Sequence, residues 1–308
     1  MITRKEIKEY LIKENNGNKY ISDKEKVEYY QRLSKAYIKN NKIKRFIYQY
    51  LEGDGNELAS KFFNVYSSSR LCFEMYSWMA NLDSILDIEF EYHLPSMKSS
   101  SFELMGSNMD VYYEAYNDIT FIESKFTEAV NNKNVIIPDA YYKEKGIAKS
   151  QKGAYLKSDL YYRFNNNYVL AKLFPTFIED IIKSINVYAE DKQDWFDVKQ
   201  EVAHFFGICG YIFKCQKKIN NKNIHFYNVI YDFDKPSLLA MEFKTKINTF
   251  IKEYIKALKL NISFDYDFKF MHKIYEEIPS DAKAFSSDKL VKGILSIYPK
   301  LFINYTTK

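Results

Sequence analysis

Two acidic residues that could bind a metal ion and a lysine that could contact a phosphate lie close together in the sequence. Asp110 opens one apolar segment, and Glu123-Ser-Lys125 ends the next. Two carboxylates bind a hard cation such as Mg²⁺, which keeps several waters and can contact phosphate oxygens. Such a metal polarises the phosphoryl group and lowers the pKa of a bound water, which lysine can orient or deprotonate. These residue types indicate metal-dependent hydrolysis of a phosphodiester bond.

A hairpin of two strands is predicted to position these three side chains. Residues 109–116 and 119–126 are predicted strands, and Asn117-Asp118 between them suits a tight turn. Glu123 and Lys125 are two residues apart near the end of the second strand, so both side chains point to the same face. Asp110 opens the first strand, which the hairpin places beside the second, so the two carboxylates and the ammonium group converge.

Helices and further strands are predicted around this hairpin. The spacing of apolar residues predicts helices at about 1–52, 67–86, 170–189, 194–214 and 236–260, and strands at 86–94, 224–233 and 262–270. The polar, lysine-rich residues 131–159 are interpreted as a long loop or insertion. The order helix, three strands, insertion, helix, strand predicts a mixed central sheet flanked by helices, an α/β (α+β) fold.

The acidic pair and its lysine resemble the PD-(D/E)XK nuclease superfamily, the fold of type II restriction endonucleases. That core consists of a helix, three strands, a helix and a fourth strand, which is the order predicted from residue 67 to 233. The segment SSSRLCFEMYSW further resembles a restriction endonuclease branch, although Met109 stands where the family name has proline. The resemblance implies a nuclease core at 67–233 with an insertion at about 127–193. An N-terminal helical region at 1–66 and a C-terminal helix-strand-helix extension at 234–308 are expected outside this core.

The resemblance also implies roles for individual residues. Asp110 and Glu123 would bind Mg²⁺, which Mn²⁺ can replace, and Lys125 would position the attacking water. Gln200 matches the glutamine of a QxxxY motif that some members carry, while His204 stands in place of the tyrosine. Glu74 matches the place of a third metal-binding acid in some relatives, with a solvated helix residue as the alternative. The implied substrate is DNA in a defence setting, cut by a homodimer, and a methyltransferase partner stays open.

Other polar residues allow both a functional and a structural interpretation. Lysines that follow the predicted hairpin could contact DNA phosphates, or they could form a solvated surface in a lysine-rich chain: Lys143, Lys145, Lys149 and Lys152. Glu201 lies on the same amphipathic helix as Gln200, and we expect it to face water.

The bulk composition sets limits on the class of protein. Hydrophobic residues make up 46% and charged residues 28%, as in ordinary globular proteins. The net charge of +5 permits DNA binding without requiring it. The three cysteines form no CxxC pair, no apolar run is long enough to span a bilayer, and no signal peptide is found, so we expect a cytoplasmic protein.

Three hypotheses follow from the sequence. The first is a magnesium-dependent DNA endonuclease used in restriction or defence. The second is a protein of nuclease fold that binds DNA or a partner without catalysis, and the third is a nuclease of the same chemistry used in repair or recombination. Walker, GxGxxG, GxSxG and HExxH motifs are missing from the sequence, so other common enzyme classes lack support.

Overall fold

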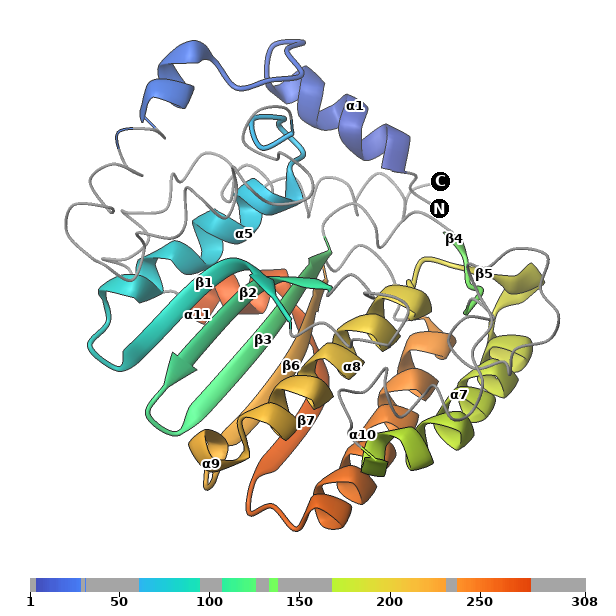
Figure 1. Ribbon diagram of the computed structural model, residues 1–308. Coiled ribbons are helices and arrows are strands. Elements are labelled where there is room, and N and C mark those ends of the chain that lie inside the picture. Colours follow the sequence, from blue (N-terminus) through green and yellow to red (C-terminus); the bar gives the residue numbers. More distant parts are fainter. Residues whose placement is uncertain are drawn as a thin grey trace, which may run out of the picture.

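The chain folds around a mixed sheet with helices on both faces (Figure 1). The computed structural model describes residues 4–28, 31, 61–94, 107–125, 133–137, 168–230 and 237–277. Five strands form the sheet in the order β1-β2-β3-β6-β7. The predicted α/β fold, with a mixed central sheet flanked by helices, is confirmed. Residues 1–3, 29–30 and 32–52 of the helical region expected at 1–52 lie outside the described residues.

The first three strands pair in an antiparallel manner: β1 (Ile85–His93), β2 (Asn108–Ala115) and β3 (Asp118–Lys125). Between β2 and β3 the register runs from Val111 opposite Ile122 to Glu114 opposite Ile119. This is the predicted hairpin. Its two strands place residue 110 and residues 123–125 at the same end of the sheet.

The other half of the sheet is parallel and consists of β6 (Asn223–Ile230) and β7 (Ser263–Phe270). β6 lies parallel to β3, and β7 lies parallel to β6. Parallel neighbours need long crossover connections, and helices supply them. Both predicted strands are confirmed, and β7 extends the central sheet as its last strand.

The helices are α1 (Arg4–Glu14), α5 (Ser68–Tyr76), α7 (Tyr168–Tyr188), α8 (Val198–Lys214), α9 (Gln216–Ile219), α10 (Leu238–Leu258) and α11 (Met271–Glu277). Side-chain oxygens cap three of them at the N-terminus, namely those of Ser67 on α5, Asp197 on α8 and Ser237 on α10. Each oxygen accepts a bond from a backbone N–H that the helix leaves unpaired. These caps fix where the helices begin.

Two helix boundaries differ from the sequence prediction. The helix expected at 67–86 ends as an α-helix at Tyr76 and continues as a 3-10 turn to Asn81. The helix expected from Asp194 begins at Val198, because Asp194 pairs with Lys133 in a small two-stranded sheet of β4 (Lys133–Asn134) and β5 (Gln193–Asp194). Pairing over a long sequence distance overrides the local helical pattern in the second case.

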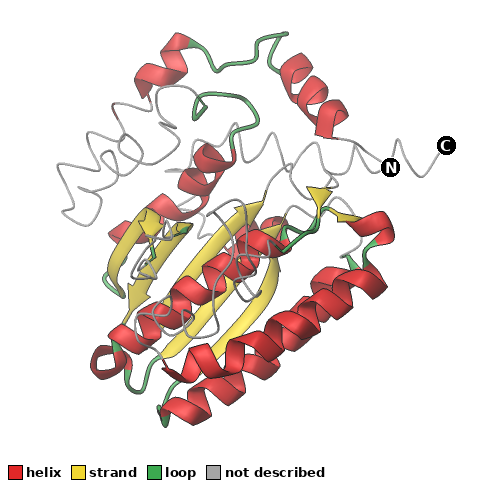
Figure 2. Ribbon diagram, turned by 45° about the vertical axis from the view of Figure 1, so that its right-hand side comes forward, coloured by secondary structure: helices red, strands yellow, loops and turns green. Residues whose placement is uncertain are grey.

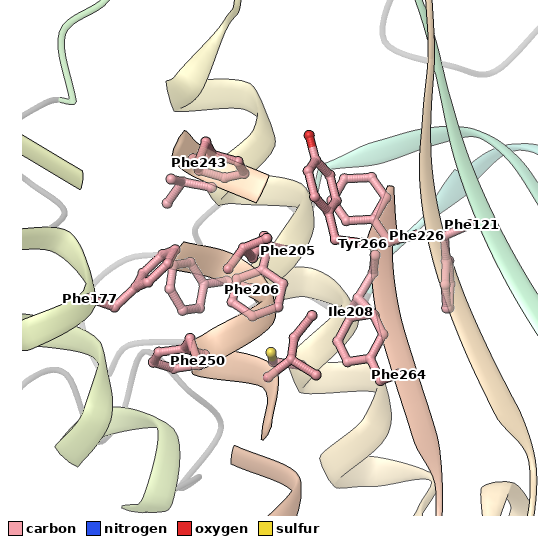
Figure 3. Close-up of a cluster of buried hydrophobic side chains, with 14 of the residues drawn as sticks. Phe121, Phe177, Phe205, Phe206, Ile208, Phe226, Phe243, Phe250, Phe264 and Tyr266 are labelled. Carbon is pink, nitrogen blue, oxygen red and sulfur yellow. The ribbon is translucent and has the colours of Figure 1, made fainter. Parts of the chain in front are cut away.

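Apolar side chains pack on both faces of the sheet. Helices α7, α8 and α10 lie on one side of the sheet, while α5 and α11 pack on the other face (Figure 2). Helix α1 lies further from the strands and adds apolar side chains to the core of that second face. Aromatic rings dominate the first core, where Phe205 contacts Phe250 at a centroid distance of 5.5 Å and Phe226 contacts Tyr266 at 4.8 Å (Figure 3). The strands between the two cores are therefore buried on both faces, which holds their backbone rigidly.

Among the described residues, no helix is long and apolar enough to cross a membrane.

Candidate active site

Asp110 lies where the β2–β3 ladder ends. The last backbone pair joins Val111 to Ile122, and beyond it the Ser124 N–H donates to Asp110 Oδ2 at 2.6 Å. A carboxylate thus takes the place of a backbone acceptor. This bond ties Asp110 to β3 between Glu123 and Lys125.

Glu123 and Lys125 are both buried, with 3% and 8% of their surface exposed, and their side chains form an ion pair. They share the sheet face that packs against α8, as their spacing on the strand predicts. Burial of a charged pair costs free energy unless further polar groups form hydrogen bonds with its remaining donors and acceptors. The residues of α8 supply such groups.

Gln200, in the first turn of α8, bridges the ion pair. Its Oε1 accepts from Lys125 Nζ at 2.6 Å, and its Nε2 donates to Glu123 Oε1 at 2.7 Å. The Gln200 backbone N–H donates to the capping Asp197 side chain, which fixes the start of the helix. The structure therefore brings Asp110, Glu123 and Lys125 together with Gln200, which lies 75 residues after Lys125 in the sequence.

His204 lies one turn further along α8 and is also buried. Its Nε2 lies 3.1 Å from Glu123 Oε2, within ion-pair distance but without the alignment of a hydrogen bond. Gln200 and His204 therefore contact the two oxygens of one carboxylate from consecutive turns of the same helix. The spacing of four residues on a helical face explains this arrangement.

The charges at this site act strongly on one another. Burial raises the pKa of Asp110 well above its usual value, and the Glu123 and Glu91 carboxylates raise it further. Burial also opposes ionisation of Glu123, but Lys125 and His204 outweigh it and lower the pKa of Glu123 to about 2. Lys125 is penalised by burial, yet the Glu123 and Asp110 carboxylates raise its pKa. Glu123 is ionised, Lys125 is charged, and Asp110 resists ionisation.

Glu91 is an acidic residue near the site that sequence reasoning did not select. It lies on β1 between the pairs Phe90–Val111 and Tyr92–Met109, and therefore opposite Asp110. Its φ of 49° is left-handed, which is rare for a non-glycine residue within a strand. The alternating acids of LDIEFEYHL contain it, but their pattern alone does not distinguish it from Asp87 or Glu89.

Glu201 does not face water, so the expectation for this residue is wrong. Its exposed fraction is 0%. The Asn228 Nδ2 atom donates to its Oε1 at 2.7 Å, and the Tyr266 hydroxyl donates to its Oε2 at 3.1 Å. In the structure α8 is rotated about its axis so that Glu201 points toward the sheet. The spacing of apolar residues in the sequence does not decide which of two neighbouring helix positions faces the sheet.

The donor set fits a hard cation. Within the described part of the chain, no three His, Cys, Asp or Glu side chains are grouped as metal ligands. Mg²⁺, however, uses one or two carboxylates and completes its shell with waters and substrate phosphates. Glu123 Oε2 is buried and has no hydrogen bond, and the ionisation of Asp110 is opposed by its surroundings. Both observations fit residues that gain from a positive charge.

Five predicted site residues fall outside this description. The side chain of Glu74, on α5, is not among the described side chains. The same holds for the four lysines expected to contact DNA, Lys143, Lys145, Lys149 and Lys152.

Comparisons with protein families, with curated proteins and with solved structures find no significant match to this chain.

Proposed function

We propose that this chain is a magnesium-dependent DNA endonuclease that hydrolyses phosphodiester bonds in restriction or defence. The observation that carries the proposal is the meeting of Asp110, Glu123 and Lys125 at one end of two paired strands, with Gln200 bridging the last two. Around this site the chain forms helix α5, the three antiparallel strands β1 to β3, helix α8 and the parallel strand β6, with β4, α7 and β5 inserted between β3 and α8. That element order is the one expected of a PD-(D/E)XK nuclease.

Asp110 and Glu123 are the residues that would hold the cation, with Mg²⁺ as the expected ion and Mn²⁺ as a substitute. When bound, the metal supplies Lewis acidity toward the phosphoryl group and a water of lowered pKa. Asp110 accepts a bond from the Ser124 N–H, which orients its carboxylate toward β3. The two carboxylates then present oxygen ligands from adjacent strands.

Lys125 serves in this proposal as a cation. Burial opposes its charge, but the nearby carboxylates raise its pKa, so the ammonium group stays protonated at neutral pH. A protonated ammonium group can donate hydrogen bonds to a phosphate oxygen or to the attacking water, but it cannot accept a proton. Lys125 would therefore orient the water and neutralise charge on the phosphate.

Gln200 keeps Lys125 and Glu123 in a fixed relative position. It uses both ends of its carboxamide, one toward the ammonium group and one toward the carboxylate. Such supporting contacts limit the movement of groups that act on a substrate.

DNA as the substrate agrees with a location in the cytoplasm. A homodimer would allow both strands of the duplex to be cut.

Plasmid cleavage tests the proposal directly. Purified protein is incubated with supercoiled plasmid and Mg²⁺, beside the variants Asp110→Ala and Lys125→Ala. Lys183→Ala is the control, because this lysine is exposed and pairs only with Asp180 among the contacts found for it. We expect the wild type and the control to nick or linearise the plasmid, and both site variants to lose at least about a hundredfold in rate.

Each other outcome has a clear meaning. Cleavage that survives both site substitutions would show that the site assignment is wrong. A wild type that binds plasmid but cuts no DNA would instead support the binding module. A preference for junctions or damaged duplex over intact duplex would support repair or recombination.

A further inference from the structure

A second buried polar group lies directly beside the candidate site, where α8 packs on the two parallel strands. Glu201 of α8 accepts hydrogen bonds from Asn228 on β6 and from Tyr266 on β7. All three side chains are at most 1% exposed. The Tyr266 hydroxyl lies at the edge of the aromatic core, whose other labelled side chains are apolar (Figure 3). Glu201 thus links α8 to two strands at once.

These contacts sit next to the residues of the site. Asn228 is the register partner of Glu123 on the neighbouring strand. Glu201 directly follows Gln200, whose carboxamide bridges Glu123 and Lys125. A shift of the first turn of α8 along the sheet would move Gln200 and Glu201 together. The anchor at Glu201 therefore decides where the Gln200 carboxamide lies.

The surroundings of Glu201 favour its uncharged form. Its two hydrogen-bond partners are neutral, and a buried carboxylate without a cation is strongly disfavoured. Burial raises the pKa of Glu201 to about 8, Lys125 opposes this rise, and Glu123 and Asp197 add to it. The hydrogen bond from Tyr266 also favours the ionised form without overcoming burial.

We propose that Glu201 is a positioning residue which, as a neutral carboxylic acid, anchors α8 to β6 and β7 and so holds Gln200 between Glu123 and Lys125. In this form it adds no third negative charge to Asp110 and Glu123, and the Lys125 charge stays available to them. The catalytic consequence rests on the proposed endonuclease function. The protonation and the anchoring do not, and they are tested separately.

Infrared difference spectroscopy tests the protonation without any substrate. The spectrum of the wild type minus that of Glu201→Gln isolates the signal of this one residue. We expect the carbonyl stretch of a protonated carboxylic acid at pH 7, and its replacement by carboxylate bands as the pH rises past about 8. A carboxylate signal at pH 7 would overturn the proposal.

Removal of one partner supplies a directional check on the same band. Tyr266→Phe deletes the hydroxyl that favours the ionised form of Glu201, so the band of the protonated acid should persist to higher pH. Tyr254→Phe is the matched control, since it deletes a buried hydroxyl that donates to Cys209 O at 3.0 Å in the same core. An equal effect of the two substitutions would contradict the assigned network.

Cleavage kinetics test the positioning role. Glu201→Gln keeps the size and polarity of the neutral acid, and we expect it to retain kcat within about threefold at pH 7. Glu201→Ala removes the anchor, and we expect kcat to fall by about ten- to a hundredfold with little change in KM. If Glu201→Gln is as impaired as Glu201→Ala, an ionised carboxylate is required and the proposal fails.

The two proposals can fail independently. A wild type that cuts no DNA refutes the proposed function, and the infrared band then still decides the state of Glu201. In that case urea unfolding measures the anchoring. We expect the urea midpoint of the wild type to fall relative to that of Glu201→Gln as the pH rises from 4.5 to about 8, because in this range Glu201 ionises in the unfolded chain but stays protonated in the folded one. Parallel midpoints across this range would refute the anchored neutral acid.

Discussion

The buried ion pair between Glu123 and Lys125 makes a strong prediction about stability. Lys125→Met removes the ammonium group and keeps an unbranched side chain of similar length, which leaves Glu123 buried without its main counter-charge. Glu123→Gln removes the partner charge in the same way. The double variant removes both charges, and no uncompensated charge stays behind.

Two lines of reasoning give similar magnitudes. The pKa of Glu123 falls from 4.5 to about 2, and a shift of that size corresponds to about 3 kcal/mol of preferential stabilisation of the ionised form. Independently, removal of one partner from a buried ion pair costs about 3–5 kcal/mol in proteins. We therefore expect Lys125→Met to lower the free energy of unfolding by about 3 kcal/mol.

The sign of the pH dependence follows from the same pKa. The folded value of Glu123 lies below its unfolded value, so its stabilising effect is complete above about pH 4.5 and is lost as the pH falls toward 2. In Lys125→Met the main cause of the lowered pKa is gone. The loss of stability on acidification should then be smaller than in the wild type.

Urea unfolding at pH 7 with a chelator present measures these effects as a double-mutant cycle. The two single variants should destabilise more in sum than the double variant does, with a coupling energy of about 1–3 kcal/mol. Asp180 and Lys183 form an exposed pair and provide a matched control cycle, whose coupling should stay below about 0.5 kcal/mol. Additive effects at Glu123 and Lys125 would refute the buried pair.

Three further predictions use other contacts of the structure. Asp110→Asn removes a carboxylate whose ionisation is opposed by burial and by neighbouring charge, so in the absence of metal it should raise the melting temperature at pH 7. In a thermal shift assay, Mg²⁺ should stabilise the wild type but not this variant. Gly207→Ala would place a Cβ 2.6 Å from Leu94 Cδ1, so it should lower the free energy of unfolding, measured with urea, by about 1–3 kcal/mol. Adding Leu94→Ala to the same chain should recover part of that loss. Gln200→Ala leaves the buried ion pair without its bridge, so we expect kcat for plasmid to fall at least about tenfold and the melting temperature to fall as well; an unchanged kcat would exclude the supporting role.

Much of the fold could be predicted from the sequence because its signals are local. Alternating apolar residues indicate the strands, and the short Asn117-Asp118 connection places Asp110 beside the strand of Glu123 and Lys125. Two residues on one strand that are two apart must share a face. The three central site residues were accessible from the sequence for this reason.

The sheet order and the helix boundaries depend on pairing at long range. The sequence does not determine that β6 lies between β3 and β7, because parallel neighbours are joined by crossovers whose length does not reveal their order. Asp194 illustrates the same limit, since its pairing with Lys133 delays the start of α8. Glu91, with its left-handed backbone, is a further case. Phe90 before it packs in the core on one face of the sheet and Tyr92 after it packs against the core on the other, and an alternating sequence pattern does not predict such a change.

The sequence by itself determined which residue types could do chemistry and that Asp110, Glu123 and Lys125 would meet. The family resemblance already named Gln200, but only the tertiary structure decided how it bridges Glu123 and Lys125 and that Glu201 lies inside the molecule. Both residues stand on one helix, one position apart, and a helix of given sequence can dock on a sheet in several rotations with similar apolar contacts. The packing of α8 against β3, β6 and β7 selects one of them, and that choice turns an apparent surface acid into a buried one.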